Sequence, residues 1–95
     1  MELRISDIVE SLNGRDAGMR FFVIKTEDGF AWLADGKRRR LEKPKLKKIK
    51  HLKLITRQAS RTAEKLRSGE KVTNSDIRRA LAEHSAEQAG EKEVC

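Results

Sequence analysis

Residues 19–34 read MRFFVIKTEDGFAWLA, two apolar runs separated by a short polar stretch. The Asp28-Gly29 pair between the runs is a strong hairpin signal, because glycine readily takes the positive φ that a tight turn requires. We therefore predict one strand over Met19–Lys25 and another over Phe30–Ala34. The two runs contain all four aromatic residues of the chain, and we expect the core to centre on them: Phe21, Phe22, Phe30 and Trp32.

The second of these strands alternates its side chains between two faces, as any extended chain does. Phe30, Trp32 and Ala34 share one face, and Ala31 and Leu33 share the other. With so few aromatic residues in the chain, we expect Trp32 to be needed in the core. The alternative is that Trp32 stacks on a nucleotide base, as aromatic residues do in proteins that bind single strands.

Three further strands are predicted outside the hairpin. One covers Asp7–Asn13, where two β-branched residues follow one another. A fourth lies within Arg39–Glu42, since Pro44 disfavours helix in the residue before it. A last strand is predicted near Ile49–Ile55, where an apolar spacing of three fits a helical turn equally well. Short strands joined by tight turns over about fifty residues predict a mainly β fold, a small and strongly bent barrel.

After Ile55 the spacing of the apolar residues becomes helical. The first apolar stripe runs from Ala59 to Leu66, and Gly69 suits a helix C-cap. A second helix is predicted after Thr73, which is a good N-cap residue. The apolar stripe of this second helix consists of Ile77, Ala80 and Leu81.

From about Ser85 the sequence is small, polar and acidic, a composition typical of a disordered end. We therefore divide the chain into a barrel over residues 1–55, a helical appendage over 56–84 and a disordered tail over 85–95. Cys95, the single cysteine, is expected to lie on this frayed end.

The excess positive charge of the chain lies in residues 35–53, DGKRRRLEKPKLKKIKHLK. Ten of the 22 lysines and arginines fall here beside two acidic residues, which makes the segment +8 while the whole chain is +7. A concentrated basic strip repels itself, and its usual partner is a polyanion. The alternative interpretation is a solvated basic face or a disordered tail. We favour a nucleic-acid partner, because the run alternates with apolar residues between segments that are predicted to fold.

Few residues suit catalysis or metal binding. His51 and His84 are far apart in sequence, and no cysteine or carboxylate lies at metal-ligand spacing from either. The GRDAG at 14–18 lacks the Lys-Ser/Thr pair of a P-loop. No long apolar run is present, and acids occupy the N-terminus where a signal peptide would be apolar. We therefore expect a cytoplasmic protein that is not an enzyme, with no cofactor, metal, membrane contact or small-molecule substrate.

Residues 8–24, IVESLNGRDAGMRFFVI, place two glycines in a loop between two apolar strands. This segment resembles the KOW motif, found in ribosomal proteins and transcription factors that have an SH3-like barrel. With three later segments it resembles the large-subunit ribosomal KOW proteins of archaea and eukaryotes and, more closely, small bacterial KOW-domain RNA-binding proteins. These later segments are ADGKRRRL at 34–41, PK at 44–45 and KHL at 50–52. The C-terminal part of the bacterial proteins is similar to KVTNSDIRRAL at 71–81.

The resemblance implies a mainly β, five-strand SH3-like barrel with a C-terminal helical appendage. It also implies RNA contact through the loop at Arg15, Asp16 and Arg20 and along the basic strip. The expected partners are structured RNA, ribosomal RNA above all, and ribosomal proteins, in a ribosome-associated protein of translation. The candidate RNA-binding residues are Arg15, Arg20, Lys37, Arg38, Arg39, Arg40, Lys43, Lys45, Lys47, Lys48, Lys50 and His51.

The roles of several residues stay open between two alternatives. Asp16 either accepts a hydrogen bond from a base or ribose, or fixes the loop by bonding the loop's own backbone amides, which we favour. His51 either contacts RNA or has a structural role, which we favour. Arg78 and Arg79 either add a second RNA surface or form the solvent side of the last helix. If the backbone is extended at Arg38–Arg40, the middle arginine projects away from the other two.

A second hypothesis for the whole chain is a protein-interaction adaptor, since SH3-like and KOW barrels also dock protein partners. In that case, neutralising Lys45, Lys47 and Lys48 would leave partner binding intact. Altering the helical tail would abolish it.

Overall fold

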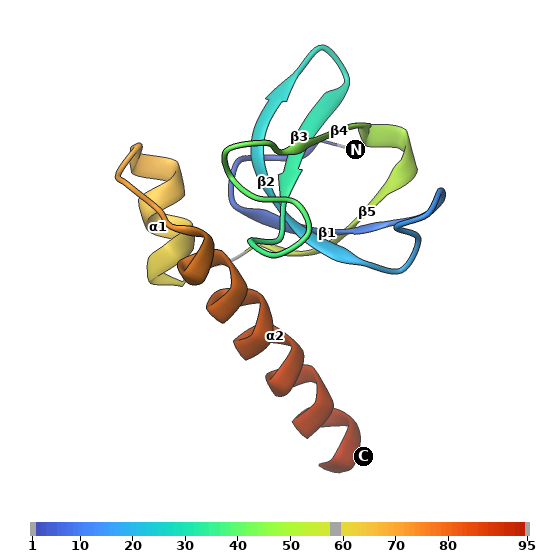
Figure 1. Ribbon diagram of the computed structural model, residues 1–95. Coiled ribbons are helices and arrows are strands. Elements are labelled where there is room, and N and C mark those ends of the chain that lie inside the picture. Colours follow the sequence, from blue (N-terminus) through green and yellow to red (C-terminus); the bar gives the residue numbers. More distant parts are fainter. Residues whose placement is uncertain (1, 58–59, 95) are drawn as a thin grey trace.

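The computed structural model describes residues 2–57 and 60–94, and it describes side chains through residue 84. The strands form one antiparallel sheet in the order β4-β3-β2-β1-β5, with two α-helices packed beside it (Figure 1). The mainly β, five-strand prediction is therefore confirmed, and among the described residues no hydrogen-bonded ladder joins β4 to β5 to close the sheet. The elements in chain order are β1 (Asp7–Ser11), β2 (Arg20–Glu27), β3 (Phe30–Ala34), β4 (Lys45–Lys48), the 3-10 helix η1 (Ile49–His51), β5 (Leu52–Arg57), α1 (Arg61–Ser68) and α2 (Asn74–Val94).

The central hairpin forms where the sequence predicted it. β3 has the predicted bounds, and Glu27 pairs with Phe30 across the two-residue turn. Asp28 and Gly29 have φ values of 47° and 80°, the two successive positive values that a type I′ hairpin turn demands. The hairpin is thus specified locally, by the residues that make the turn.

The core was predicted to centre on all four aromatic residues, and this holds for Phe21 and Phe22 but not for Phe30 and Trp32. Ala31 and Leu33 are fully buried, whereas Phe30 and Trp32 are only partly buried. The pairing of β3 with β2 explains which side chains of β3 are buried. Leu33 lies opposite the buried Val23, so both side chains point to the same face of the sheet. Alternation along a strand predicts which residues share a face, but the partner strand decides which face is buried.

Two hydrophobic clusters lie on opposite sides of the central strands. The neighbours Ile8 and Val9 point to different sides, so β1 contributes to both clusters, and β2 does the same. One cluster, on the inner side of the sheet, includes Leu3, Val9, Phe21, Val23, Ala31, Leu33 and Leu52. The other cluster, between the sheet and the helices, includes Ile8, Phe22, Ile77 and Ala80.

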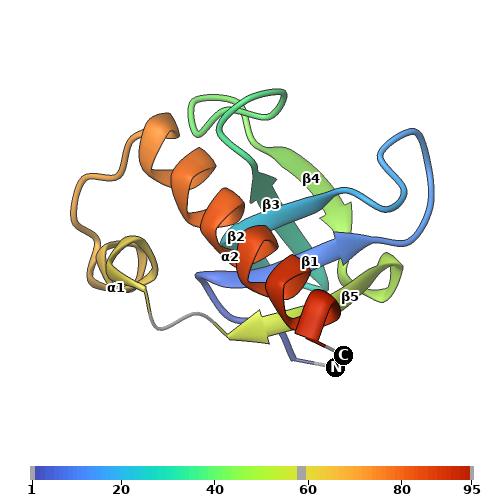
Figure 2. The ribbon, with the colours of Figure 1, turned by 90° about the horizontal axis from the view of Figure 1, so that it is seen from below.

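The last helix therefore shares a core with the sheet, which the predicted appendage did not anticipate. Figure 2 shows α2 crossing over β1 and β2. Ile77 of α2 is fully buried, and burying such a side chain stabilises a fold by about 1.5–3 kcal/mol. Removal of α2 would take Ile77 and Ala80 out of this cluster and so expose part of Ile8 and Phe22.

The fourth strand was predicted in the wrong place. β4 is Lys45–Lys48, and Arg39–Glu42 lies in the preceding loop. The Asp35 carboxylate accepts hydrogen bonds from the backbone amides of Lys37 and Arg39, both at 2.9 Å, and these local bonds favour a tight loop over a strand. For the last strand both alternatives are partly right, because η1 forms a helical turn immediately before β5.

The helix ends follow the predicted capping signals. Gly69 ends α1 with φ 78°, as predicted, and Ser60, which was not predicted as a cap, caps the start of α1 by accepting from the amide of Ala63. Before α2, Thr73 and Asp76 each accept a hydrogen bond from the other's backbone amide, a reciprocal capping box.

The C-terminal segment differs from the prediction of a disordered end after Ser85. α2 continues to Val94, and this stretch is rich in alanine, glutamate and glutamine, which favour helix. Figure 1 shows α2 extending well beyond the sheet. The predictions for Ala59 and Cys95 concern positions outside the described residues. Across the part of the chain that the structure describes, no helix is both long enough and apolar enough to pass through a bilayer.

Candidate nucleic-acid interface

The loop between β1 and β2 is fastened to β4 through the buried carboxylate of Asp16. Asp16 Oδ1 accepts hydrogen bonds from Ser11 Oγ and Lys47 Nζ, both at 2.9 Å. Lys45 Nζ lies 2.7 Å from the other carboxylate oxygen. Lys47 Nζ also donates to Ser11 Oγ at 2.6 Å and to the backbone carbonyl of Asn13 at 2.8 Å. We call Ser11, Asp16, Lys45 and Lys47 the Asp16 clamp.

The clamp keeps Asp16 ionised. Burial raises the pKa of this carboxyl, but the two lysines and Ser11 lower the pKa by more, so that it lies well below its ordinary range. Asp16 thus has the structural role that we favoured, although its partners are side chains of β1 and β4 instead of the loop's own amides. Because Lys45 and Lys47 face this carboxylate, they contribute less free charge to a ligand than the sequence indicates.

A second loop, residues 35–43, is fastened to α2. The backbone carbonyl of Gly36 accepts from Arg78 Nη1 at 2.6 Å, and the amide of Leu41 donates to Asn74 Oδ1 at 2.8 Å. Asn74 Nδ2 in turn donates to Glu42 at 2.8 Å. Gly36 has φ 77°, and a Cβ there would collide with the backbone carbonyl of Asn74. Arg78 therefore holds the loop, a role that neither alternative for it had included.

The two fastened loops meet at a hollow of about 220 Å³. Met19 and Phe21 supply apolar surface there, and Arg38 Nη1 lies 3.9 Å from the sulfur of Met19. Among the described residues, the arginines that line this hollow form no ion pair with a carboxylate. We call this feature the basic hollow. Its cationic lining consists of Arg15, Arg38, Arg39 and Lys45, and the carboxylate of Asp16, which is paired with Lys45, lines it as well.

The basic hollow brings together residues that the sequence separates by more than twenty positions. Arg38 and Arg39 both line it, so the alternating projection expected of an extended backbone does not apply. Planar guanidinium groups of this kind suit bidentate contact with phosphate. The exposed Lys37, Arg40 and Lys43 lie on the same 35–43 loop.

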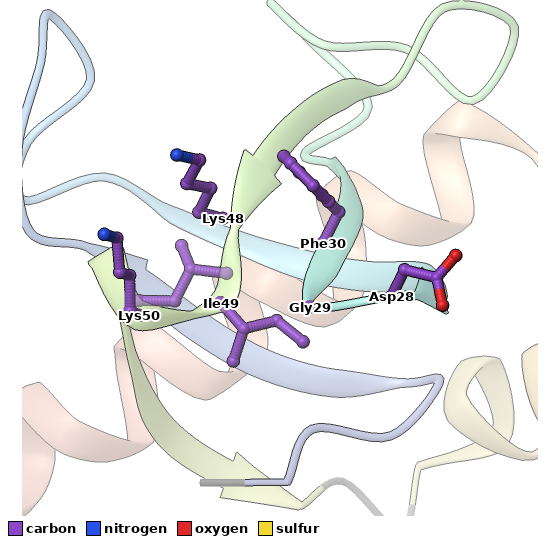
Figure 3. Close-up of a pocket in the computed structure, with 7 residues that line it drawn as sticks. Asp28, Gly29, Phe30, Lys48, Ile49 and Lys50 are labelled. Atoms are coloured by element: carbon purple, nitrogen blue, oxygen red, sulfur yellow. The ribbon is translucent and has the colours of Figure 1, made fainter.

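The remaining candidates lie elsewhere. Arg20 faces Glu10 at 3.7 Å across the β1–β2 pair. His51 is half-buried, and its carbonyl accepts the amide of Leu12 at 3.0 Å, which ties η1 to the base of the β1–β2 loop. Lys48 and Lys50 are exposed on another side of η1, beside a second hollow that is shown in Figure 3.

Sequence reasoning missed Ser11, Asp35 and Asn74 as residues that support the two loops. A signal existed for Asp35, because an Asp before glycine commonly bonds the following backbone amides. Asn74 bonds a residue 33 positions away, and no local pattern reports such a contact.

Within residues 2–57 and 60–84, no three His, Cys, Asp or Glu side chains come together as a group that could hold a metal ion. No protein-family model matches the chain, and no curated protein matches it.

Proposed function

We propose that this chain is an RNA-binding module that attaches to structured RNA, ribosomal RNA above all, through the β1–β2 loop and the segment 37–53. The basic hollow is the observation that carries the proposal. Three arginines from two separate loops line it and form no ion pair with a carboxylate among the described residues. The Asp16 clamp holds the first loop, and hydrogen bonds to α2 hold the second. Such a fixed arrangement of cations suits the phosphates of a folded nucleic acid.

The fold supports the same proposal. Five short antiparallel strands in the order β4-β3-β2-β1-β5, joined by tight turns, support the proposal of a small SH3-like barrel of the KOW type. In this proposal the phosphate contacts come from the exposed cations, and the Asp16 clamp positions them. The proposed contact residues are Arg15, Lys37, Arg38, Arg39, Arg40, Lys43, Lys48 and Lys50.

The first test is the salt dependence of binding to a fluorescently labelled RNA hairpin. If about six cations neutralise phosphates, log K should fall with log salt at a slope of roughly −4 to −5. In the double variant Arg38→Gln/Arg39→Gln, the affinity should fall and the slope should become shallower by about 1.5 to 2.

A matched control removes two charges from the helical side of the molecule. Arg61 and Lys71 are both exposed, and Arg61→Gln/Lys71→Gln should leave the affinity for the hairpin within about twofold of the parent, since few of its phosphates would lie within a Debye length. Equal losses in the two double variants would show that only the overall charge matters. A salt-independent affinity would reject RNA binding through phosphates.

A protein-interaction adaptor is the second candidate, because α2 continues to Val94, beyond the turns that contribute Ile77 and Ala80 to the core. An adaptor would keep its partner in the Arg38→Gln/Arg39→Gln variant and lose it when the chain is truncated after residue 84. Sucrose-gradient sedimentation of cell extracts separates the two proposals: an RNA-binding protein of the ribosome moves with ribosomal subunits and leaves them after ribonuclease treatment.

A further inference from the structure

The outer face of the β2–β3–β4 sheet is covered by α2 at one end only. Phe22 pairs with Ala34 at the covered end and lies in the cluster with α2. At the other end, Phe30 and Trp32 belong to neither hydrophobic cluster and are partly exposed. Two partly exposed aromatic side chains therefore lie at the end of this sheet face that α2 does not cover.

Ladder pairing places charged and apolar side chains around these two rings. Trp32 lies between Lys25 and Leu46, and Phe30 lies between Glu27 and Lys48, in two adjacent cross-strand rows. Lys25 Nζ is 5.0 Å from the centroid of the Trp32 ring, a cation–π contact. Lys25 also pairs with Glu27 at 3.4 Å, which balances the one carboxylate among these residues.

A hollow of about 570 Å³ opens beside Phe30, with Ile49 and Leu52 as further apolar lining. Lys48 and Lys50 stand at its edge, and Figure 3 shows their ammonium groups pointing to the same side while the carboxylate of Asp28 points away. Neither lysine makes an ion pair among the described residues. Apolar surface with two free cations along one edge matches a nucleotide, which has an apolar base face and an anionic phosphate.

We propose that Phe30 and Trp32 form a stacking surface for unpaired bases of RNA, with Lys48 and Lys50 on the adjoining backbone. This inference rests on the proposed RNA-binding function and narrows its ligand to RNA that contains a single-stranded segment. The two rings lie two residues apart on one strand, about 7 Å, whereas bases in a duplex repeat every 3.4 Å or so along each strand. Only bases that have left the helical stack can meet both rings, and a paired base offers no free face to a side chain.

The test uses Trp32 as its own reporter, because it is the only tryptophan in the chain. Titration with a single-stranded oligouridine should quench its fluorescence, and an RNA duplex without unpaired nucleotides should leave the emission nearly unchanged. Trp32→Leu and Phe30→Leu should each lower the affinity for oligouridine about tenfold, within the usual range for loss of one stacked base, while the affinity for the duplex stays within about twofold.

Two control variants separate stacking from folding. Trp32→Phe retains an aromatic ring and should recover most of the affinity, whereas loss of fold would not be rescued in this way. Ile5→Ala removes another exposed apolar side chain, one that lines neither hollow, and should change neither affinity. Urea unfolding of each variant establishes that the compared proteins are folded.

The outcomes distinguish this inference from the function on which it rests. If oligouridine binds without quenching Trp32, and the leucine variants bind as well as the parent, the stacking surface is refuted while RNA binding through the basic hollow stands. If neither RNA binds the parent protein, the proposed function itself fails. Quenching that is equal with duplex and single strand also refutes the preference for unpaired bases.

Discussion

The Asp16 clamp and the 35–43 loop draw on the same basic run and use its charge in opposite ways. In the clamp, Lys45 and Lys47 surround a buried carboxylate, and their charge holds the β1–β2 loop against β4. In the 35–43 loop, hydrogen bonds between the backbone and the side chains of Asn74 and Arg78 of α2 hold the loop, and Arg38 and Arg39 have no carboxylate partner among the described residues. The charge of a sequence segment is therefore a poor measure of the charge that a ligand meets.

The largest effect is expected where the 35–43 loop contacts α2. In Gly36→Ala the new Cβ would collide with the Asn74 carbonyl, and the residue must keep a φ of 77°. We expect a loss of about 3–5 kcal/mol in the free energy of unfolding, from the left-handed backbone and the steric overlap together. Urea denaturation measures this loss.

Gly69→Ala is the matched control, since Gly69 has φ 78° and its Cβ would meet nothing within 4 Å. This variant should lose only about 1 kcal/mol. Similar losses in the two variants would show that the packing of Gly36 against α2 is unimportant to the fold.

A smaller loss is expected when the clamp is broken. Asp16→Asn keeps the shape of the side chain but leaves the lysine at position 47, whose side chain is only 9% exposed, without its counter-charge. We expect a loss of about 2 kcal/mol at neutral pH, below the range for fully buried pairs because Lys45 is 25% exposed. Asp35→Asn removes one carboxylate from the other, exposed loop and should cost less than half as much. A reversed order would show that the clamp contributes little.

The smallest and most specific effect is expected in the pH dependence of the stability of Asp16→Asn. The lysines hold the pKa of Asp16 below its ordinary 3.8, so its contribution is complete above that value and is lost as the pH falls below it. The stability difference between the parent and Asp16→Asn should therefore narrow between about pH 5 and pH 3. A difference that stays constant over this interval would mean that Asp16 titrates normally in the folded protein.

The sequence predicted the parts of the fold that depend on neighbouring residues. The turn at Asp28-Gly29, the N-cap at Thr73 and the C-cap at Gly69 all depend on local backbone preferences, and all three are present in the structure. The position of β4 could not be predicted, because the bonds that shape the preceding loop come from Asp35 and from α2. The burial of Ala31 in place of Trp32 likewise depends on the partner strand.

The candidate site was predicted in composition but not in arrangement. The sequence identified the basic run and the glycine loop, and the structure places Arg15 beside Arg38 and Arg39. The sequence could not distinguish cations without a carboxylate partner from those of the Asp16 clamp, since Asp16 and Lys47 are 31 residues apart. Contacts over such distances follow from tertiary packing and not from local pattern.

The contact between Gly36 and the first turn of α2 also orders events during synthesis. A nascent chain that has released only its five strands lacks both the cover for Phe22 and the anchor for its arginine-bearing loop. The local bonds to Asp35 can form in such a chain, but we expect the loop to reach its final position only after the beginning of α2 has emerged and docked. The newly synthesised chain would therefore complete its proposed RNA-binding surface last, after the five strands have been made.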